Sequence, residues 1–278
     1  MQGQRRPRGS ASRVRFLGSE RDKAHRQWYR IIAKHYDALC GPSYVSKAYP
    51  FLIDIMRRRG PVKDVLDPAC GTFALDIPLV RRGYHIVGRD LSPDMLRVAR
   101  ENVSKARQTA DLGIGDMRTL RLGRTFDAVL CLGTAFNYLW SLGDARKALR
   151  TFHMHLRRGG VLVLDVTNFD AWIESPKNVL VQNDYRAEDG TRIAIYALNE
   201  QDLATGTHLA RMITAVQGKE RLDIAVDEAL LKIWTKETLA GALRNAGFRP
   251  VEWWGDLRLG IRYQRSRSPR LIVVAVRD

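Results

Sequence analysis

Short apolar runs alternate with amphipathic segments between residues 62 and 168. The apolar runs predict strands at residues 64–67, 85–89, 111–115, 128–132 and 161–166, and the amphipathic segments predict helices at 75–82, 93–107 and 144–156. Strands that alternate with helices in this way usually pair in parallel, and the helices cover both faces of the sheet. The pattern therefore predicts an α/β fold with an open, Rossmann-like, mostly parallel sheet.

After Asn168 the apolar positions alternate in the manner of antiparallel strands. Strands are predicted at residues 179–185, 191–200, 208–217 and 222–234, with turns at 188–190 and 204–206. A helix at 236–245, capped by Thr235 and stopped by Gly247, precedes two further strands at 250–254 and 270–276. These two strands bring the main sheet to seven, and the antiparallel strands form an inserted β-meander that is expected to act as a lid.

The patterns divide the chain into five segments. Residues 1–22 are predicted to form a basic, disordered tail, and residues 23–60 form two N-terminal helices, at 23–36 and 44–59, that close over the site. Residues 61–170 form the Rossmann-like core, residues 171–234 the antiparallel lid, and residues 235–278 the helix and strands that complete the core sheet.

Composition and charge narrow the class of protein. The chain has 278 residues, 45% of them apolar, and no stretch approaches the ~20 apolar residues that cross a bilayer, so no membrane span is expected. The N-terminus lacks the apolar segment of a secretory signal, which predicts a cytoplasmic protein. The three cysteines have no metal-ligand spacing, so no metal is expected. The net charge of +16 keeps an RNA partner open, beside the alternative of a solvated arginine-rich surface.

Candidate chemistry gathers at the ends of the first four strands. The first strand runs into the small-residue turn Asp67-Pro-Ala-Cys-Gly71, and the second ends in Asp90 about twenty residues later, where a carboxylate can accept both ribose hydroxyls of a nucleoside cofactor. The third strand ends at Gly115-Asp116-Met117, where a carboxylate can accept from an adenine amine. The fourth enters a loop of small and aromatic residues, from Cys131 to Tyr138. Together these ends predict one nucleoside-shaped site.

The segments VLDPACGT, VGRDLSPDMLRVA, FDAVLCLGTAFNYL and LRRGGVLVLDVTNFD resemble the class I S-adenosylmethionine (SAM)-dependent methyltransferases. Within that family they are most similar to glycine and sarcosine N-methyltransferases and related small-molecule N-methyltransferases. The resemblance implies SAM as cofactor, S-adenosylhomocysteine as product, and residues 61–170 as the SAM-binding core. It assigns cofactor-binding roles to Asp67, Ala69, Gly71, Asp90, Leu91, Met95, Asp116, Met117, Cys131, Leu132 and Gly133, and to Tyr36, which resembles a tyrosine that closes over SAM.

Three positions depart from the family pattern. Phe73 replaces the second glycine of the turn, and its phenyl ring would abolish the site if it filled the cofactor slot. Thr167 stands where the glycine-methylating relatives place an arginine for the substrate carboxylate, and Thr134 stands where they have an asparagine. Glycine itself is therefore not expected as the substrate.

The predicted function is methyl transfer to a small-molecule acceptor, with an amine nitrogen favoured. Tyr138, Asn137 and Tyr36 are the candidate catalytic residues that orient the acceptor, and Asp165 is a further candidate for orienting it. For the loop residues Tyr138 and Asn137 a packing role is the alternative. An RNA methyltransferase that uses the basic surface is the second hypothesis, and a SAM-binding fold that no longer catalyses is the third. The sequence leaves the acceptor and the formation of a homo-oligomer open.

Overall fold

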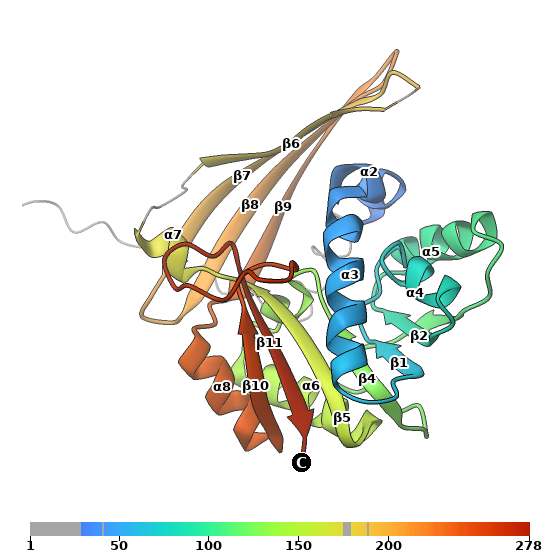
Figure 1. Ribbon diagram of the computed structural model, residues 1–278. Coiled ribbons are helices and arrows are strands. Elements are labelled where there is room, and N and C mark those ends of the chain that lie inside the picture. The colour runs from blue at the N-terminus through green and yellow to red at the C-terminus, as the bar shows by residue number, and fades with distance from the viewer. Residues whose placement is uncertain (1–28, 41, 175–178, 188) are drawn as a thin grey trace, which may run out of the picture.

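A seven-stranded sheet runs through the computed structural model, which describes residues 29–40, 42–174, 179–187 and 189–278 (Figure 1). The strand order is β10-β11-β5-β4-β1-β2-β3. The strands are β1 (Asp64–Asp67), β2 (His85–Asp90), β3 (Asp111–Ile114), β4 (Phe126–Cys131), β5 (Leu156–Thr167), β10 (Phe248–Trp254) and β11 (Arg270–Arg277). Neighbours from β3 to β5 pair in parallel, and β11 is antiparallel to both of its neighbours. The predicted mostly parallel sheet is confirmed, and the predicted tail lies outside the described residues.

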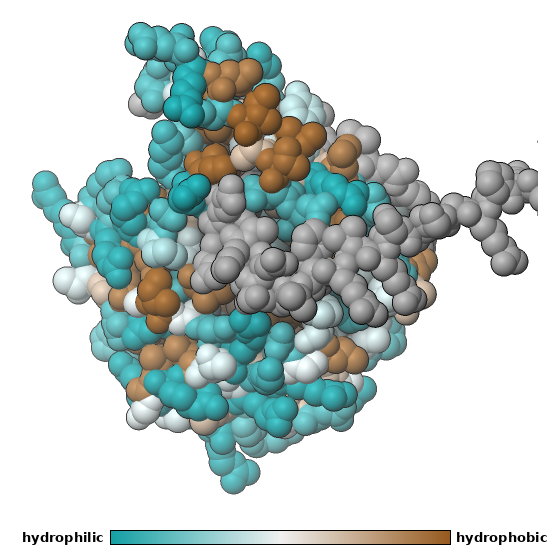
Figure 2. Space-filling model, turned by 180° about the vertical axis from the view of Figure 1, so that it is seen from behind, coloured by the Kyte–Doolittle hydropathy of each residue, from teal (hydrophilic) through white to brown (hydrophobic). Residues whose placement is uncertain are grey.

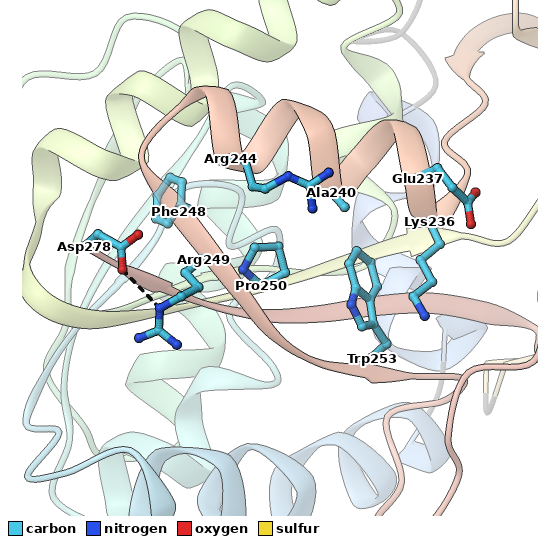
Figure 3. A pocket seen from close by; sticks show the side chains of 9 residues that line it. All are labelled: Lys236, Glu237, Ala240, Arg244, Phe248, Arg249, Pro250, Trp253 and Asp278. Carbon is cyan, nitrogen blue, oxygen red and sulfur yellow. Dashed lines mark hydrogen bonds and ion pairs between the residues drawn. The ribbon is translucent and has the colours of Figure 1, made fainter.

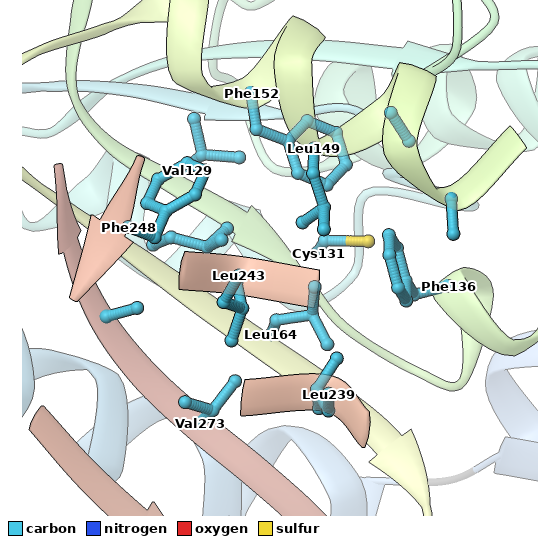
Figure 4. Packing of buried hydrophobic residues seen from close by; sticks show 14 of the residues in the cluster. Val129, Cys131, Phe136, Leu149, Phe152, Leu164, Leu239, Leu243, Phe248 and Val273 are labelled. Carbon is cyan, nitrogen blue, oxygen red and sulfur yellow. The ribbon is translucent and has the colours of Figure 1, made fainter. Parts of the chain in front are cut away.

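Helices cover both faces of this sheet. One face packs against α3 (Pro42–Arg58), α4 (Asp76–Arg81) and α5 (Pro93–Lys105), and the other against α6 (Leu142–His155) and α8 (Lys236–Asn245). Successive residues of β4 alternate between the two apolar clusters, because side chains of a strand point to opposite faces in turn. Figure 4 shows Val129 and Cys131 of β4 packed with α6 and α8. None of the described helices is both long and apolar enough to span a bilayer.

Local caps fix where the helices begin. The Ser92 hydroxyl accepts a hydrogen bond from the Met95 amide at the start of α5, and Pro93 supplies the first helical position. The predicted cap of α8 is also present, because Thr235 and Thr238 bond to each other's backbone amides. The local sequence therefore fixes where α5 and α8 begin.

The lid is a separate four-stranded antiparallel sheet with the order β6-β7-β8-β9, as predicted. Its strands are β6 (Val179–Arg186), β7 (Arg192–Asp202), β8 (Thr207–Gln217) and β9 (Leu222–Lys232), and the short helix α7 (Asp170–Glu174) precedes them. Its inner face packs against Tyr36 and Tyr138. Its outer face leaves Leu222, Ile224 and Val226 largely exposed, and apolar side chains gather over this sheet in Figure 2.

Two boundaries differ from the prediction. The predicted helix at 23–36 instead ends in the short segments η1 (Ala33–His35) and α2 (Tyr36–Cys40), and its first residues, 23–28, lie outside the described chain. Strand β5 begins at Leu156, before the predicted residue 161. Phe126 of β4 pairs with Leu156, but Ala128, two residues later, pairs with Val161, so β5 has extra residues between these two pairs. These residues, 157–160, form a bulge of two arginines and two glycines, without an alternating apolar pattern.

Candidate active site

A cavity of about 570 Å³ opens at the carboxyl edge of the parallel strands, beneath the N-terminal helices. Clefts at this edge are where open α/β sheets bind their ligands. The cavity brings together most of the residues selected from the sequence: Tyr36, Asp67, Ala69, Gly71, Asp90, Leu91, Met95, Asp116, Met117, Leu132, Gly133 and Tyr138.

Cys131 and Asn137 are not part of the cavity lining. Cys131 is fully buried in the apolar cluster between β4 and α6. Asn137, in the short helix η2 (Ala135–Tyr138), is also fully buried, and both ends of its amide bond to backbone. Its Nδ2 donates to the Lys232 carbonyl (2.8 Å), and its Oδ1 accepts from the Thr167 amide (3.0 Å). Asn137 thus ties the loop after β4 to the lid and to β5, and a catalytic role for it stays a prediction.

The turn after β1 is held by two carboxylates. Asp67 Oδ1 accepts from the Ala69 amide (2.9 Å), and Asp90 Oδ2 accepts from the Gly71 amide (2.8 Å). Gly71 adopts a positive φ of 52°, and a Cβ there would come within 3.3 Å of Met95. The positive φ therefore favours glycine here, and a side chain would also press against the terminal methyl of Met95.

Phe73 also adopts a positive φ, of 62°, which residues other than glycine rarely do. Its ring is buried and points toward Gly88 of β2, where an added Cβ would lie 3.0 Å from it. Phe73 does not line the cavity. The substitution thus keeps the backbone shape of a glycine turn, and its side chain fills the core instead of the predicted cofactor slot.

The carboxylates of Asp90 and Asp116 face the same cavity, as the sequence predicted, but both also have partners within the chain. Asp90 Oδ1 accepts from the Ser92 amide (2.8 Å), in addition to the bond from Gly71. Asp116 accepts from three donors of Arg118: the backbone amide (2.8 Å to Oδ1), Nε (3.0 Å to Oδ1 and 2.9 Å to Oδ2) and Nη2 (2.6 Å to Oδ2). A carboxylate has about four acceptor positions, so Asp90 keeps about two for a ligand and Asp116 keeps about one.

Asp37 fastens the N-terminal helices to the glycine-containing turn. Its carboxylate accepts from the Thr72 hydroxyl and from Asn102 Nδ2 (2.6 Å), and Asn102 also donates to the Thr72 carbonyl (3.1 Å). The predicted closure of the N-terminal segment over the site therefore has a specific polar contact at its centre.

Acidic side chains dominate the cavity, although the whole chain is strongly basic. Its charged lining residues are Asp37, Asp67, Asp76, Asp90, Asp116 and Arg118. Arg118 is itself ion-paired with Asp116 and Asp144. The cavity therefore presents an excess of negative charge, suited to a cationic ligand.

Burial perturbs three of these acids. Desolvation, with a smaller contribution from the charge of Asp90, raises the pKa of Asp67 to about 7. Burial and the nearby Asp67 raise the pKa of Asp76 well above its ordinary value, and burial raises the pKa of Asp90. Asp76 Oδ1 has no hydrogen-bond partner within the described chain. Buried acids whose charge is uncompensated mark a site that gains from bound positive charge.

The lining also contains side chains that were not predicted from the sequence, among them Tyr29, Tyr44, Asp76 and Arg118. Tyr44 lies at the start of α3, and its hydroxyl is close to Gly133: a Cβ added to Gly133 would be 3.8 Å from the hydroxyl oxygen. That hydroxyl is buried without a partner among the described residues, and burial raises the pKa of Tyr44 well above 10, which keeps the phenol neutral. Only the tertiary packing of α3 over β4 brings it to the site, so no local signal could have identified it.

A second cavity, of about 660 Å³, lies between α8 and β10 and shares no lining residue with the first (Figure 3). Both basic and acidic side chains line it, and Arg249 pairs with Asp278 (3.2 Å). It lacks the convergence of buried acids that characterises the first cavity.

Comparison with known proteins agrees with this geometry. Residues 65–160 match the family model described as a methyltransferase domain. A glycine/sarcosine N-methyltransferase of Parasynechococcus marenigrum (strain WH8102) is 36% identical over 126 residues, 45% of this chain and 44% of the relative. A dTDP-3-amino-3,4,6-trideoxy-alpha-D-glucopyranose N,N-dimethyltransferase of Streptomyces venezuelae is 33% identical over 49% of this chain and 57% of the relative. The chain thus spans about half the length of these curated relatives.

Solved structures match over most of the chain. A SAM-bound amino pentose methyltransferase from Micromonospora echinaspora has a TM-score of 0.69 at 28% identity, covering 89% of this chain and 97% of its own. A SAM-dependent methyltransferase from Clostridium acetobutylicum ATCC 824 shares the fold, with a TM-score of 0.76 at 20% identity and coverage of 90% and 99%. The methyltransferase domain and the fold predicted from the sequence are therefore confirmed.

Proposed function

We propose that this chain, which belongs to the SAM-dependent methyltransferases, transfers a methyl group from SAM to the nitrogen of a small-molecule amine. The observation that carries the proposal is the acidic cavity at the carboxyl edge of the sheet. SAM bears a sulfonium and an ammonium group, and an amine is the acceptor class that such a cavity attracts.

The residues of the cavity fit this cofactor. Asp67 and Asp76 are buried acids beside the turn at Gly71, and a methionine ammonium bound there would favour their ionised forms and pair with them. Asp90, at the end of β2, would accept from the ribose hydroxyls, and Asp116 and Met117 would hold the adenine. Gly71 and Gly133 leave room for the cofactor, since neither has a side chain in the cavity.

When bound, SAM supplies an activated methyl group whose leaving group needs no proton. The acceptor nitrogen attacks through its lone pair, so a protonated amine first loses a proton to solvent. The protein therefore has to orient the neutral amine and exclude water from the methyl group. We assign the orienting role to Tyr36 and Tyr138, which line the cavity and also pack against the inner face of the lid. Asn137 would act by holding the loop that carries Tyr138 against the end of β9. The closed N-terminal segment, fastened through Asp37, would limit the access of water.

The charges in the cavity restrict the acceptor. The one basic side chain in the described lining, Arg118, is engaged by two aspartates, so nothing there favours a carboxylate or phosphate close to the reacting nitrogen. This argues against glycine and against an RNA base flanked by phosphates. Two relatives are named as N,N-dimethyltransferases of dTDP-linked amino sugars, in which the amine and the diphosphate are on different ring carbons. An amine on a frame that is neutral around the nitrogen, such as an amino sugar with or without an attached nucleotide, is therefore the favoured acceptor class.

The test is a screen of methyl acceptors with labelled SAM, containing amino sugars, free amines, amino acids and total RNA. We expect incorporation into a neutral-frame amine, at a rate that changes little between low and moderate salt. Methylation of RNA with a steep salt dependence would refute the proposal, because phosphate contacts weaken strongly with salt.

A further inference from the structure

The loop after β4 contains a strained residue at the edge of the cavity. Gly133 and Thr134 both adopt positive φ angles, of 65° and 72°. Glycine does so at little cost, but a β-branched residue such as threonine rarely does. A strained backbone persists only where its surroundings hold it, and such residues gather at functional sites. The contacts that hold Thr134 in this conformation therefore indicate which residues shape the edge of the cavity.

A buried ion pair holds this bend. Asp165 of β5 is fully buried, and Arg270 of β11 donates to it from both Nε and Nη2, each at 2.7 Å. Asp165 Oδ2 also accepts from the Gly133 amide (3.0 Å). Arg270 Nη1 donates to the Thr134 hydroxyl (2.9 Å) and to the Thr167 hydroxyl (3.3 Å). The ion pair thus contacts both residues of the bend, one through its backbone and the other through its side chain.

Most N–H groups of the Arg270 guanidinium take part in holding the bend. The bonds to Asp165, Thr134 and Thr167 use four of its five N–H groups. The Thr134 and Thr167 hydroxyls also bond to each other (3.1 Å). Such planar, bidentate geometry suits arginine and cannot be reproduced by a lysine ammonium. Arg270 is thus built to fix other groups in place, with little capacity left for a substrate.

We infer that Arg270 is a positioning residue for methyl transfer: with Asp165 it sets the Gly133–Thr134 bend and so the wall of the cavity where the acceptor lies. The wall includes Leu132, Gly133, Ala135 and Tyr138, all within one turn of the bend. This inference rests on the proposed function for its catalytic consequence, but the fixing of the bend can be measured without any acceptor.

Two variants test it, with a matched control. Arg270→Lys keeps the positive charge and loses the fork, and Thr167→Val removes one hydroxyl at nearly constant shape in case the lysine variant fails to fold. Arg249→Lys is the control, since that exposed arginine contacts Asp278 and lies in the other cavity. Hydrogen exchange of the peptide covering residues 132–139, measured by mass spectrometry, should be faster in Arg270→Lys and unchanged in the control.

Kinetics then separate positioning from general stability. In Arg270→Lys the single-turnover rate with the acceptor found in the screen should fall by about 10- to 100-fold, because small misplacements at a reacting centre have large effects. The Kd of S-adenosylhomocysteine should rise much less than the rate falls, by about fivefold at most, because the bend borders only part of the cofactor site, and Asp67, Gly71 and Asp90 are untouched. A wild-type exchange pattern together with a wild-type rate would overturn the inference, as would equal losses of rate and cofactor affinity. If the wild type methylates no amine, the proposed function fails, and the exchange comparison alone decides the role of Arg270.

Discussion

The affinity of the chain for SAM should depend on pH through Asp67. In the ligand-free chain, burial raises the pKa of Asp67 from 3.8 to about 7, so near neutral pH this side chain is partly protonated. A cationic ligand beside it favours the carboxylate and lowers its pKa in the complex, so binding should release a proton. Lowering the pH below 7 should then weaken binding, since the ligand must displace a proton.

The size of the effect follows from the fraction of ligand-free chain in which Asp67 is ionised. That fraction is about one half at pH 7 and about 3% at pH 5.5. If Asp67 is fully ionised in the complex, the Kd of SAM rises by about 16-fold across this range, or about 1.6 kcal/mol. The SAM amino group, with an ordinary pKa near 8, stays mostly protonated throughout the range and adds little.

The raised pKa of Asp67 has the opposite effect on the stability of the ligand-free chain: stability falls as the pH rises, whereas SAM affinity increases. The folded chain retains a proton on Asp67 that the unfolded chain loses above about pH 4. The contribution of Asp67 to stability is therefore present at low pH and disappears as the pH rises to about 7. Because SAM binds more tightly at pH 7, it should raise the melting temperature more at pH 7 than at pH 5.5.

Isothermal titration calorimetry tests this linkage. Titrations at pH 5.5 and 7.0, each in two buffers with different ionisation enthalpies, give both the Kd and the number of protons released. Asp67→Asn, which cannot titrate, should show a flatter pH profile and isolates this residue from Asp76 and Asp90. A wild-type Kd that is equal at both pH values, with heats independent of the buffer, would refute the reasoning.

Three further substitutions separate the contributions of the site. Phe73→Gly should lower the free energy of unfolding by about 2 kcal/mol in urea titrations, because the lost buried ring outweighs the relieved strain, while SAM affinity stays nearly constant since the ring lies outside the cavity. Asp37→Ala should weaken SAM binding by about 1–2 kcal/mol in calorimetry, because its contact to Thr72 closes the N-terminal segment, and an effect no larger than that of the exposed Asp54→Ala would count against this role. Asp90→Ala should weaken SAM binding by roughly 1–3 kcal/mol, and an unchanged Kd would remove Asp90 from the site.

The net charge of the chain shows how composition alone can mislead. A value of +16 left an RNA partner open, yet the cavity itself carries mainly aspartates. Net charge describes the average field around the surface, whereas ligand choice depends on the few charges that line one cavity. Those charges come from turns that are far apart in the sequence, so their sum could not be read from composition.

Much of the fold and the cofactor edge was predictable from the sequence, because the signals are local. Strand–helix alternation predicted the mostly parallel core, and the placing of Asp67, Asp90 and Asp116 at strand ends predicted that they share one edge. Parallel strands joined by helices place their carboxyl ends together regardless of side-chain detail. The bulge at residues 157–160 was missed because it depends on the register between β4 and β5.

Tertiary structure alone decided how the site is held. Arg270 and Asp165 are 105 positions apart, and they meet because β11 pairs with β5. The direction of the Phe73 ring likewise depends on space beside Gly88, and the approach of Tyr44 to Gly133 depends on how α3 packs. The sequence by itself determined which backbone segments form strands and helices, since periodicity and turn residues act over a few positions. Which side chains converge depends on strand pairing and packing between distant segments, and these emerge only when the whole chain is folded.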